Sequence, residues 1–111
     1  MTSIIYDDKH FALSIKGHAG YGESGKDIVC ASVSILAMTL GATLLKMASE
    51  GKLQREAIVD MSKGDVYIQV YPQSLYLNDC KIIFDSICEG FALLSKNYPE
   101  NVQYICRNDL I

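Results

Sequence analysis

The sequence predicts an α/β fold of the α+β type, in which a mixed β-sheet and two long helices follow the order β-β-α-β-β-α-β. Two pairs of short segments alternate apolar and polar residues across turn-forming residues, as β-hairpins do. Two longer segments repeat apolar residues every three or four positions, as helices do. Half of the 111 residues are hydrophobic, enough to bury a core without disulfides or metals. We therefore expect a single small domain over residues 1–111.

The first hairpin pairs Ile4–Tyr6 with a second strand across the turn Asp7-Asp8-Lys9. In that second strand, Phe11, Leu13 and Ile15 alternate with polar neighbours. This alternation predicts one buried and one exposed face. Four glycines then occur between Gly17 and Gly25, which interrupts regular structure with a flexible loop.

The first helix is predicted to begin after Asp27, a typical N-cap residue, and to end at Gly51. Small residues such as Gly41 predict that another element packs closely against it. The apolar repeat comprises Val29, Val33, Leu36, Leu40, Leu44 and Met47.

A second hairpin is predicted in the other half of the chain, from the alternation in Ala57–Met61 and Val66–Val70 around the turn Ser62-Lys63-Gly64. Helical spacing then extends from Tyr76 to Tyr98. A last strand is expected over Val102–Cys106. The pattern contains no linker and no internal repeat.

Composition excludes several classes of function. The net charge of −3 gives no reason to expect a nucleic-acid partner. No uninterrupted apolar run approaches eighteen residues and no signal peptide is recognisable, so we expect a cytoplasmic protein outside the membrane. The four cysteines form no C-x-x-C pair and no zinc-site spacing, which favours reduced thiols without a metal.

The glycine-rich loop matches two nucleotide-binding patterns by its letters. Residues 20–25 fit G-x-G-x-x-G, but the strand before them belongs to a hairpin rather than to a parallel β-α-β unit. Residues 20–27 nearly fit the phosphate loop G-x-x-x-x-G-K-[ST], but Asp27 stands where a hydroxyl must bind magnesium. A carboxylate there would cap the helix and repel a phosphate. Neither pattern predicts a nucleotide site.

Cys30 and His18 form a candidate catalytic pair on either side of this loop. With Asp27 as N-cap, Cys30 is the third helical residue, where unpaired amides and the helix dipole favour a thiolate. The eleven intervening residues can return the His18 imidazole to the thiol. A structural role is the alternative interpretation, with Cys30 buried in the core and His18 facing solvent, since free cysteine is often buried.

The residues Gly17-His18-Ala19 and the segment Gly25–Ser34, together with their spacing, closely resemble the signature of the ribosomal-processing cysteine protease family called Prp. The segment reads G-K-D-I-V-C-A-S-V-S, and no position departs from the signature. Beyond residues 17–34 the resemblance is one of element order.

The resemblance implies that His18 and Cys30 are the catalytic pair. It also implies a bacterial cytoplasmic homodimer that removes the N-terminal extension of large-subunit ribosomal protein twenty-seven, after two phenylalanines, without a cofactor. The loop that includes Gly17, Ala19, Gly20, Gly22 and Gly25 would lie flexibly over the substrate.

Several roles remain open from the residues alone. Asp27 could orient His18 or cap the helix, and its place before an apolar repeat favours the cap. Backbone amides of the first helical turn, including that of Cys30, are candidate oxyanion donors. Ser32 and Ser34 could add hydroxyls to the site. A second hypothesis is a noncatalytic module in which the loop and helix N-terminus bind a peptide or an anion while Cys30 is buried.

Overall fold

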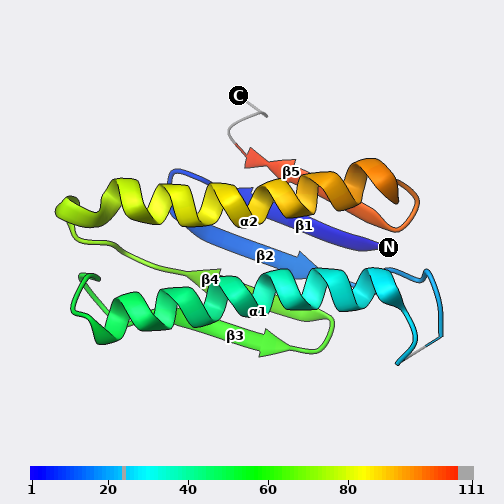
Figure 1. The fold of residues 1–111 in the computed structure, drawn as a ribbon, viewed down its shortest axis with the longest axis horizontal. Helices are drawn as coiled ribbons and strands as arrows, with labels where there is room; N and C mark the ends of the chain where they lie inside the picture. Colours follow the sequence, from blue (N-terminus) through cyan, green and yellow to red (C-terminus); the bar gives the residue numbers. More distant parts are fainter. Residues whose placement is uncertain (24, 108–111) are drawn as a thin grey trace.

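The predicted hairpins and helices are all present in the computed structural model, which describes residues 1–23 and 25–107 (Figure 1). Ser24 of the glycine-rich loop lies outside the described residues. The predicted order β-β-α-β-β-α-β is confirmed, with a short 3-10 helix added before the second long helix. The elements are β1 (Thr2–Asp7), β2 (Ala12–Lys16), α1 (Ile28–Ser49), β3 (Ile58–Ser62), β4 (Asp65–Gln69), η1 (Ser74–Tyr76), α2 (Leu77–Asn97) and β5 (Val102–Cys106).

Strand β2 begins one residue later than the alternation predicted. Phe11 has a φ of 47° and lies in the turn between β1 and β2. This left-handed conformation interrupts the extended backbone of a strand. The Phe11 carbonyl still accepts the N–H of Val70, just beyond the end of β4, at 3.2 Å.

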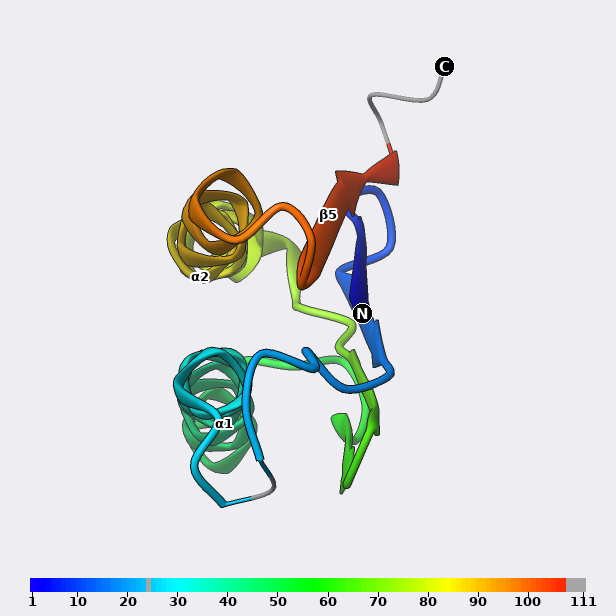
Figure 2. The same cartoon turned by 90° about the vertical axis from the view of Figure 1, so that its right-hand side faces the viewer.

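The five strands form one mixed sheet in the order β3-β4-β2-β1-β5. Neighbouring strands are antiparallel, except for β1 and β5, which run parallel. Both helices lie on the same face of the sheet, as the turned view in Figure 2 shows. The domain therefore has two layers, one of helices and one of strands.

The core lies between these two layers. Leu13 and Ile68 are paired across β2 and β4, and both are fully buried, as is Leu40 of α1. On the α2 side, the ring of Tyr6 stacks on that of Phe84 with centroids 5.1 Å apart. Buried residues of each helix repeat thus lie in the core between the helices and the sheet, as their spacing predicted.

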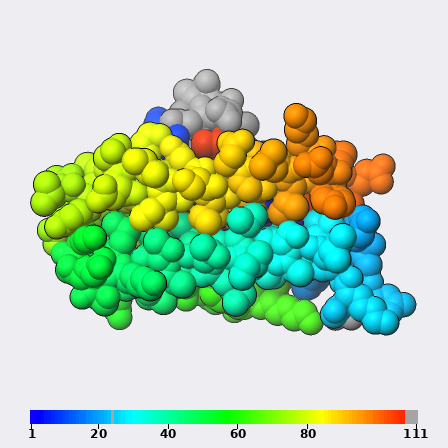
Figure 3. All heavy atoms as spheres, in the orientation of Figure 1, coloured from blue at the N-terminus to red at the C-terminus, as the bar shows by residue number. Residues whose placement is uncertain are grey.

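Helix α1 packs closely on both sides, as its small residues predicted. A Cβ atom at Gly41 would lie 3.0 Å from Cγ1 of Val59 in β3. On its other side, Leu36 approaches α2 so closely that a Cβ at Gly90 would lie 2.9 Å from its methyl carbons. The two helices lie side by side in Figure 3. Packing at glycine therefore fixes α1, and with it the residues of its first turn.

By length and composition, α1 could cross a membrane, and it is the one helix of the described residues with this property. The core helix of a soluble protein passes the same test. Val29, Val33 and Leu44 of α1 are buried in the core between helices and sheet. Ile28, Ile35, Met38 and Leu45 of the same helix are exposed, so packing in the core accounts for the apolar residues of one face of α1.

Four segments meet at one end of the molecule (Figure 1). They are the end of β2, the first turn of α1, the β3–β4 turn and the turn between α2 and β5. Hydrogen bonds join them, beginning with Gly17 N–H to the Gly64 carbonyl at 3.0 Å. The sequence motif at residues 17–34 lies at this end.

Candidate active site

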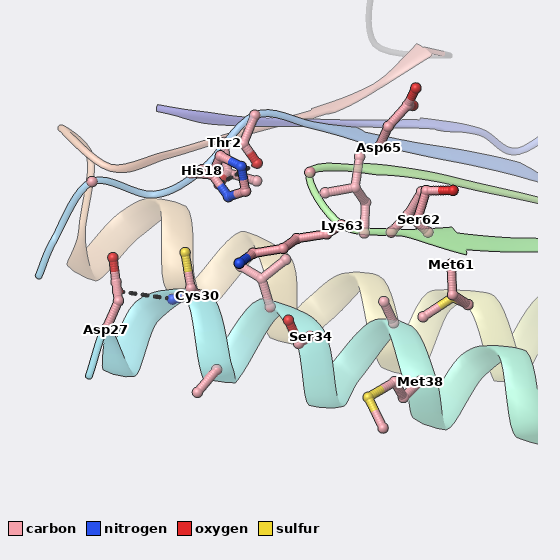
Figure 4. A pocket seen from close by; sticks show the side chains of 18 of the residues that line it. Thr2, His18, Asp27, Cys30, Ser34, Met38, Met61, Ser62, Lys63 and Asp65 are labelled. Carbon is pink, nitrogen blue, oxygen red and sulfur yellow. Dashed lines mark hydrogen bonds between the residues drawn. The ribbon is translucent and has the colours of Figure 1, made fainter. Parts of the chain in front are cut away.

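A cavity of about 810 Å³ opens between α1 and the β3–β4 hairpin (Figure 4). It is lined by the three residues that the sequence singled out as catalytic or orienting, His18, Asp27 and Cys30. Ala19 is buried rather than part of the cavity wall. Of the predicted loop glycines, Gly17, Gly20, Gly22 and Gly25 all line it.

Cys30 lies in the first turn of α1, and its side chain is partly exposed to the cavity. Its Sγ accepts the backbone N–H of Ala19 at 3.3 Å. A donor aimed at sulfur favours the charged thiolate over the neutral thiol. The glycine-rich loop thus contacts the Cys30 thiol through the backbone N–H of Ala19. The sequence had predicted a contact from the His18 ring.

Asp27 is the N-cap of α1, as predicted. Its Oδ1 accepts the N–H groups of Val29 and Cys30 at 2.9 and 3.0 Å. Its Oδ2 accepts those of Tyr21 and Gly22 at 2.9 and 3.1 Å. These N–H groups, that of Cys30 foremost, hold the pKa of Asp27 below its ordinary value. One carboxylate therefore caps the helix and ties the loop to it.

The hydrogen bonds of the Asp27 carboxylate affect two expectations, the Cys30 amide as oxyanion donor and the helix N-terminus as an anion site. The Cys30 amide was a candidate oxyanion donor, but it already donates to Asp27. With the Val29 amide also taken, these first-turn donors are not available to a phosphate or another anion. The anion-binding form of the alternative function therefore loses the N–H groups on which it depended.

His18 follows the end of β2 and packs against the β3–β4 turn. A Cβ atom at Gly64 would lie 2.9 Å from Nε2 and 3.0 Å from Cε1 of the ring, so only glycine leaves room for the imidazole. In Figure 4, His18 and Cys30 come from opposite walls of the same cavity. Within the described residues, no hydrogen bond joins the ring to Sγ of Cys30.

Glycine is required at the start of the loop for steric reasons. Gly17 has a φ of 89°, and a Cβ there would lie 2.4 Å from the carbonyl oxygen of Met1. Gly20 and Gly25 also have positive φ, at 67° and 82°. The close approach of Gly17 to Met1 fixes the direction in which the chain leaves β2, and therefore the backbone position of His18.

Several lining residues carried no signal in the sequence. Lys63 belongs to a segment that indicated only a turn, yet Figure 4 shows its side chain extending across the cavity from that turn. Met38 and Met61 line the part farther along α1. Of the two serines considered, Ser34 lines the cavity, whereas Ser32 donates to the carbonyl of Ile28 at 2.7 Å.

The remaining cysteines lie away from the cavity. Burial raises the pKa of Cys80 to about 12, and that of Cys88 to about 12 as well. Both side chains are buried within α2, and Cys106 is in β5. None of the four cysteines, all within the described part of the chain, forms a disulfide. Among residues 1–23 and 25–107, no cluster of His, Cys, Asp or Glu could hold a metal ion.

Comparison with known proteins relates both the sequence and the fold to one group. The model of the family described as cysteine protease Prp matches residues 1–103. The ribosomal processing protease Prp of S. aureus, in complex with a covalently linked product peptide, has a TM-score of 0.71 at 19% identity, covering 95% of this chain and 96% of that chain. Its complex with a substrate peptide gives 0.65 at 18% identity, over 95% and 96%.

A third solved structure, SMU.848 from Streptococcus mutans, has a TM-score of 0.64 at 28% identity, covering 95% of this chain and 90% of that one. No curated protein matches the chain. The structural likenesses confirm the predicted fold class, a mixed sheet with two helices.

Proposed function

Because the chain belongs to the Prp family of cysteine proteases, we propose that it is an endopeptidase with Cys30 as nucleophile and His18 as general base and acid. One observation carries the assignment. The Sγ of Cys30 faces a cavity that also holds His18, and it accepts the backbone N–H of Ala19 at 3.3 Å. In this proposal residues 1–111 form one peptidase domain that needs no metal or cofactor.

The proposed reaction has two stages. His18 takes the thiol proton of Cys30, and the thiolate attacks the scissile carbonyl carbon. The tetrahedral intermediate then collapses and expels the amine, which takes that proton from His18. His18 then removes a proton from water, and the hydroxide attacks the thioester to release the acid product and the thiol. The ring must move toward the sulfur for these steps, and such hydrogen bonds often tighten only with substrate bound.

The proposed substrate is the bacterial large-subunit ribosomal protein twenty-seven, cut after two phenylalanines in its N-terminal extension. The cavity supports an apolar substrate segment. From Cys30 it continues along α1 to Met38, opposite Met61 and Val66 of the β3–β4 hairpin. Methionine side chains adapt their shape and contact aromatic rings favourably. Two aromatic residues before the scissile bond would fit such a wall.

Cleavage of the extended ribosomal protein tests the proposal. The purified chain is mixed with that precursor, and the products are identified by mass. The proposal predicts one cut after the phenylalanine pair, lost when both phenylalanines are replaced by aspartate. A folded chain that leaves the precursor intact would overturn the substrate assignment.

The same proposal has the chain working as a homodimer in the bacterial cytoplasm, without nucleic acid or membrane. The support is the family resemblance and, for nucleic acid, the net charge of −3. Light scattering at the concentration used for cleavage tests the dimer. A monomer with full activity would contradict this part of the proposal and leave the chemistry standing.

A further inference from the structure

Ala19 connects Cys30 to a distant part of the chain. Its N–H donates to Sγ of Cys30 at 3.3 Å, and its carbonyl accepts Nδ2 of Asn101 at 2.9 Å. These two backbone groups belong to adjacent peptide planes that share the Ala19 Cα. The Asn101 carboxamide therefore restrains the residue whose N–H is aimed at the sulfur, although 82 positions separate it from Ala19.

Asn101 is itself held by the end of the sheet. Its N–H donates to the Tyr98 carbonyl at 2.9 Å, and its carbonyl accepts the N–H of Thr2 in β1 at 2.9 Å. The Tyr98 ring also meets the ring of Tyr21 edge to face, with centroids 5.3 Å apart. The turn between α2 and β5 thus touches the loop at two places, one on each side of Gly20.

The loop would not hold this geometry by its own backbone preference. Gly17 and Gly20, on either side of the His18–Ala19 pair, both have positive φ, and glycine adopts many other conformations at low cost. Outside contacts must therefore select the observed one. Besides Cys30, whose Sγ accepts the Ala19 N–H, Asn101 is the residue whose side chain hydrogen-bonds to Ala19 itself.

We infer that Asn101 is a positioning residue for the nucleophile: by binding the Ala19 carbonyl, it keeps the Ala19 N–H directed at Sγ of Cys30 and so favours the thiolate. The inference rests on the proposed function only in taking Cys30 as the nucleophile. A side-chain donor is essential at position 101, because the acceptor is a carbonyl. An aspartate there would keep the shape and place a negative charge beside that carbonyl.

The test measures the reactivity of Cys30 against pH and needs no peptide substrate. Wild type, Asn101→Asp and Asn101→Ala are treated with iodoacetamide, and modification of the Cys30 peptide is followed by mass. Weakening a hydrogen bond to a charged group predicts a Cys30 rate at neutral pH lower by roughly three- to tenfold in both variants. The limiting rate at high pH should stay the same, so the midpoint of the profile should move upward.

The matched control is Asn97→Ala. Asn97 lies in the last turn of α2, and its Nδ2 also donates to a backbone carbonyl, that of Leu93 at 2.8 Å, but away from the cavity. Its profile should superimpose on that of wild type. His18, Asp27, Lys63 and Asp65 are the ionisable side chains that line the cavity with Cys30, and all are unchanged in every variant.

Unfolding is detected in the same experiment, because Cys80 and Cys88 react only when the core opens. Wild-type profiles in folded Asn101→Asp or Asn101→Ala would overturn the inference, as would an equal shift in Asn97→Ala. The outcome is separable from the proposed function. A chain that cleaves no precursor can still show the shift, and a chain that cleaves normally with no shift contradicts the role of Asn101 alone.

Discussion

The first turn of α1 and the interior of α2 place cysteine side chains in opposite environments, one partly exposed and the other buried. Cys30 is partly exposed, faces a cavity and accepts an N–H at 3.3 Å. Cys80 and Cys88 lie inside the helix repeat of α2, where burial raises the pKa of each thiol to about 12. A cysteine in this fold is thus prepared for chemistry by its place at a helix start, while burial keeps Cys80 and Cys88 neutral.

The largest effect on peptide cleavage is expected from replacing Cys30, in comparison with replacing the buried Cys80. Cys30→Ala should abolish peptide cleavage and leave the melting temperature nearly unchanged, because the side chain is only partly packed. Cys80→Ala should keep the cleavage rate and lose on the order of 1 kcal/mol of stability from its buried site. Cleavage assays and thermal melts of both variants check this. Normal turnover by Cys30→Ala would end the comparison.

Alkylation sharpens the comparison within one protein. In the folded chain at neutral pH, Cys30 should react with iodoacetamide about a hundredfold or more faster than Cys80 and Cys88, because buried structural thiols are inert. Adding denaturant should bring the three rates together. Peptide masses after timed quenching give each rate. Equal rates in the folded protein would show that burial does not separate Cys80 and Cys88 from Cys30.

The next largest effect on cleavage is expected at Gly64, which packs against the His18 ring. At Gly64, where φ is 75°, an alanine Cβ would lie 2.9 Å from Nε2 of His18. Gly64→Ala should therefore displace the ring and lower kcat/KM by about tenfold or more. Gly51→Ala is the control, since Gly51 has a φ of 74° but no atom within 4 Å of the added carbon.

Both glycine variants should lose about 1 kcal/mol of stability for the left-handed alanine. Only Gly64→Ala should lose activity, and the alkylation of Cys30 should persist in both. If Gly51→Ala and Gly64→Ala lose activity equally, general strain rather than the position of His18 is responsible.

The smallest effect follows from Asp27. Its pKa is lowered in the folded chain, so its stabilising contribution is complete above the ordinary aspartate pKa of about 3.9 and is lost as pH falls through the lower folded value. Asp27→Asn should keep the Val29 and Cys30 bonds but not both loop bonds, because its Nδ2 cannot accept from Tyr21 and Gly22.

Melting curves between pH 3 and 7 measure this difference. Wild type should lose stability toward acid more steeply than Asp27→Asn, whereas Asp27→Ala should be about 1 kcal/mol less stable at neutral pH than wild type. Asp27→Asn should retain much of its cleavage activity, since the helix cap survives. If it melts normally and cleaves nothing, Asp27 belongs to the catalytic set.

Local patterns predicted most of the fold. Alternation of apolar and polar residues predicted both hairpins, and the apolar repeats predicted both helices. Asp27 and Gly51 marked the ends of the first helix. The pairing of β1 with β5 was not predictable, because it joins strands about a hundred residues apart. Phe11 departed from the pattern: its φ is 47°, and its ring lies against that of Phe84 with centroids 5.7 Å apart.

The candidate site was predictable only where residue type carries the chemistry. Cys30, His18 and Asp27 were identified from one segment, and all three line the cavity. Gly64 indicated only a turn, and Asn101 acts through a side chain that reaches Ala19 from the far end of the chain. The Ala19 N–H could not be assigned at all, since every residue other than proline has one.

Trapping of the covalent intermediate tests the central claim most directly. The chain is mixed with excess precursor, quenched in acid within the first turnover, digested, and searched for a thioester with the N-terminal fragment. The account predicts that the added mass is on the peptide containing Cys30 and is absent when His18 is replaced by alanine. Cleavage that proceeds with no adduct on Cys30, or with the adduct on Cys106, would contradict it.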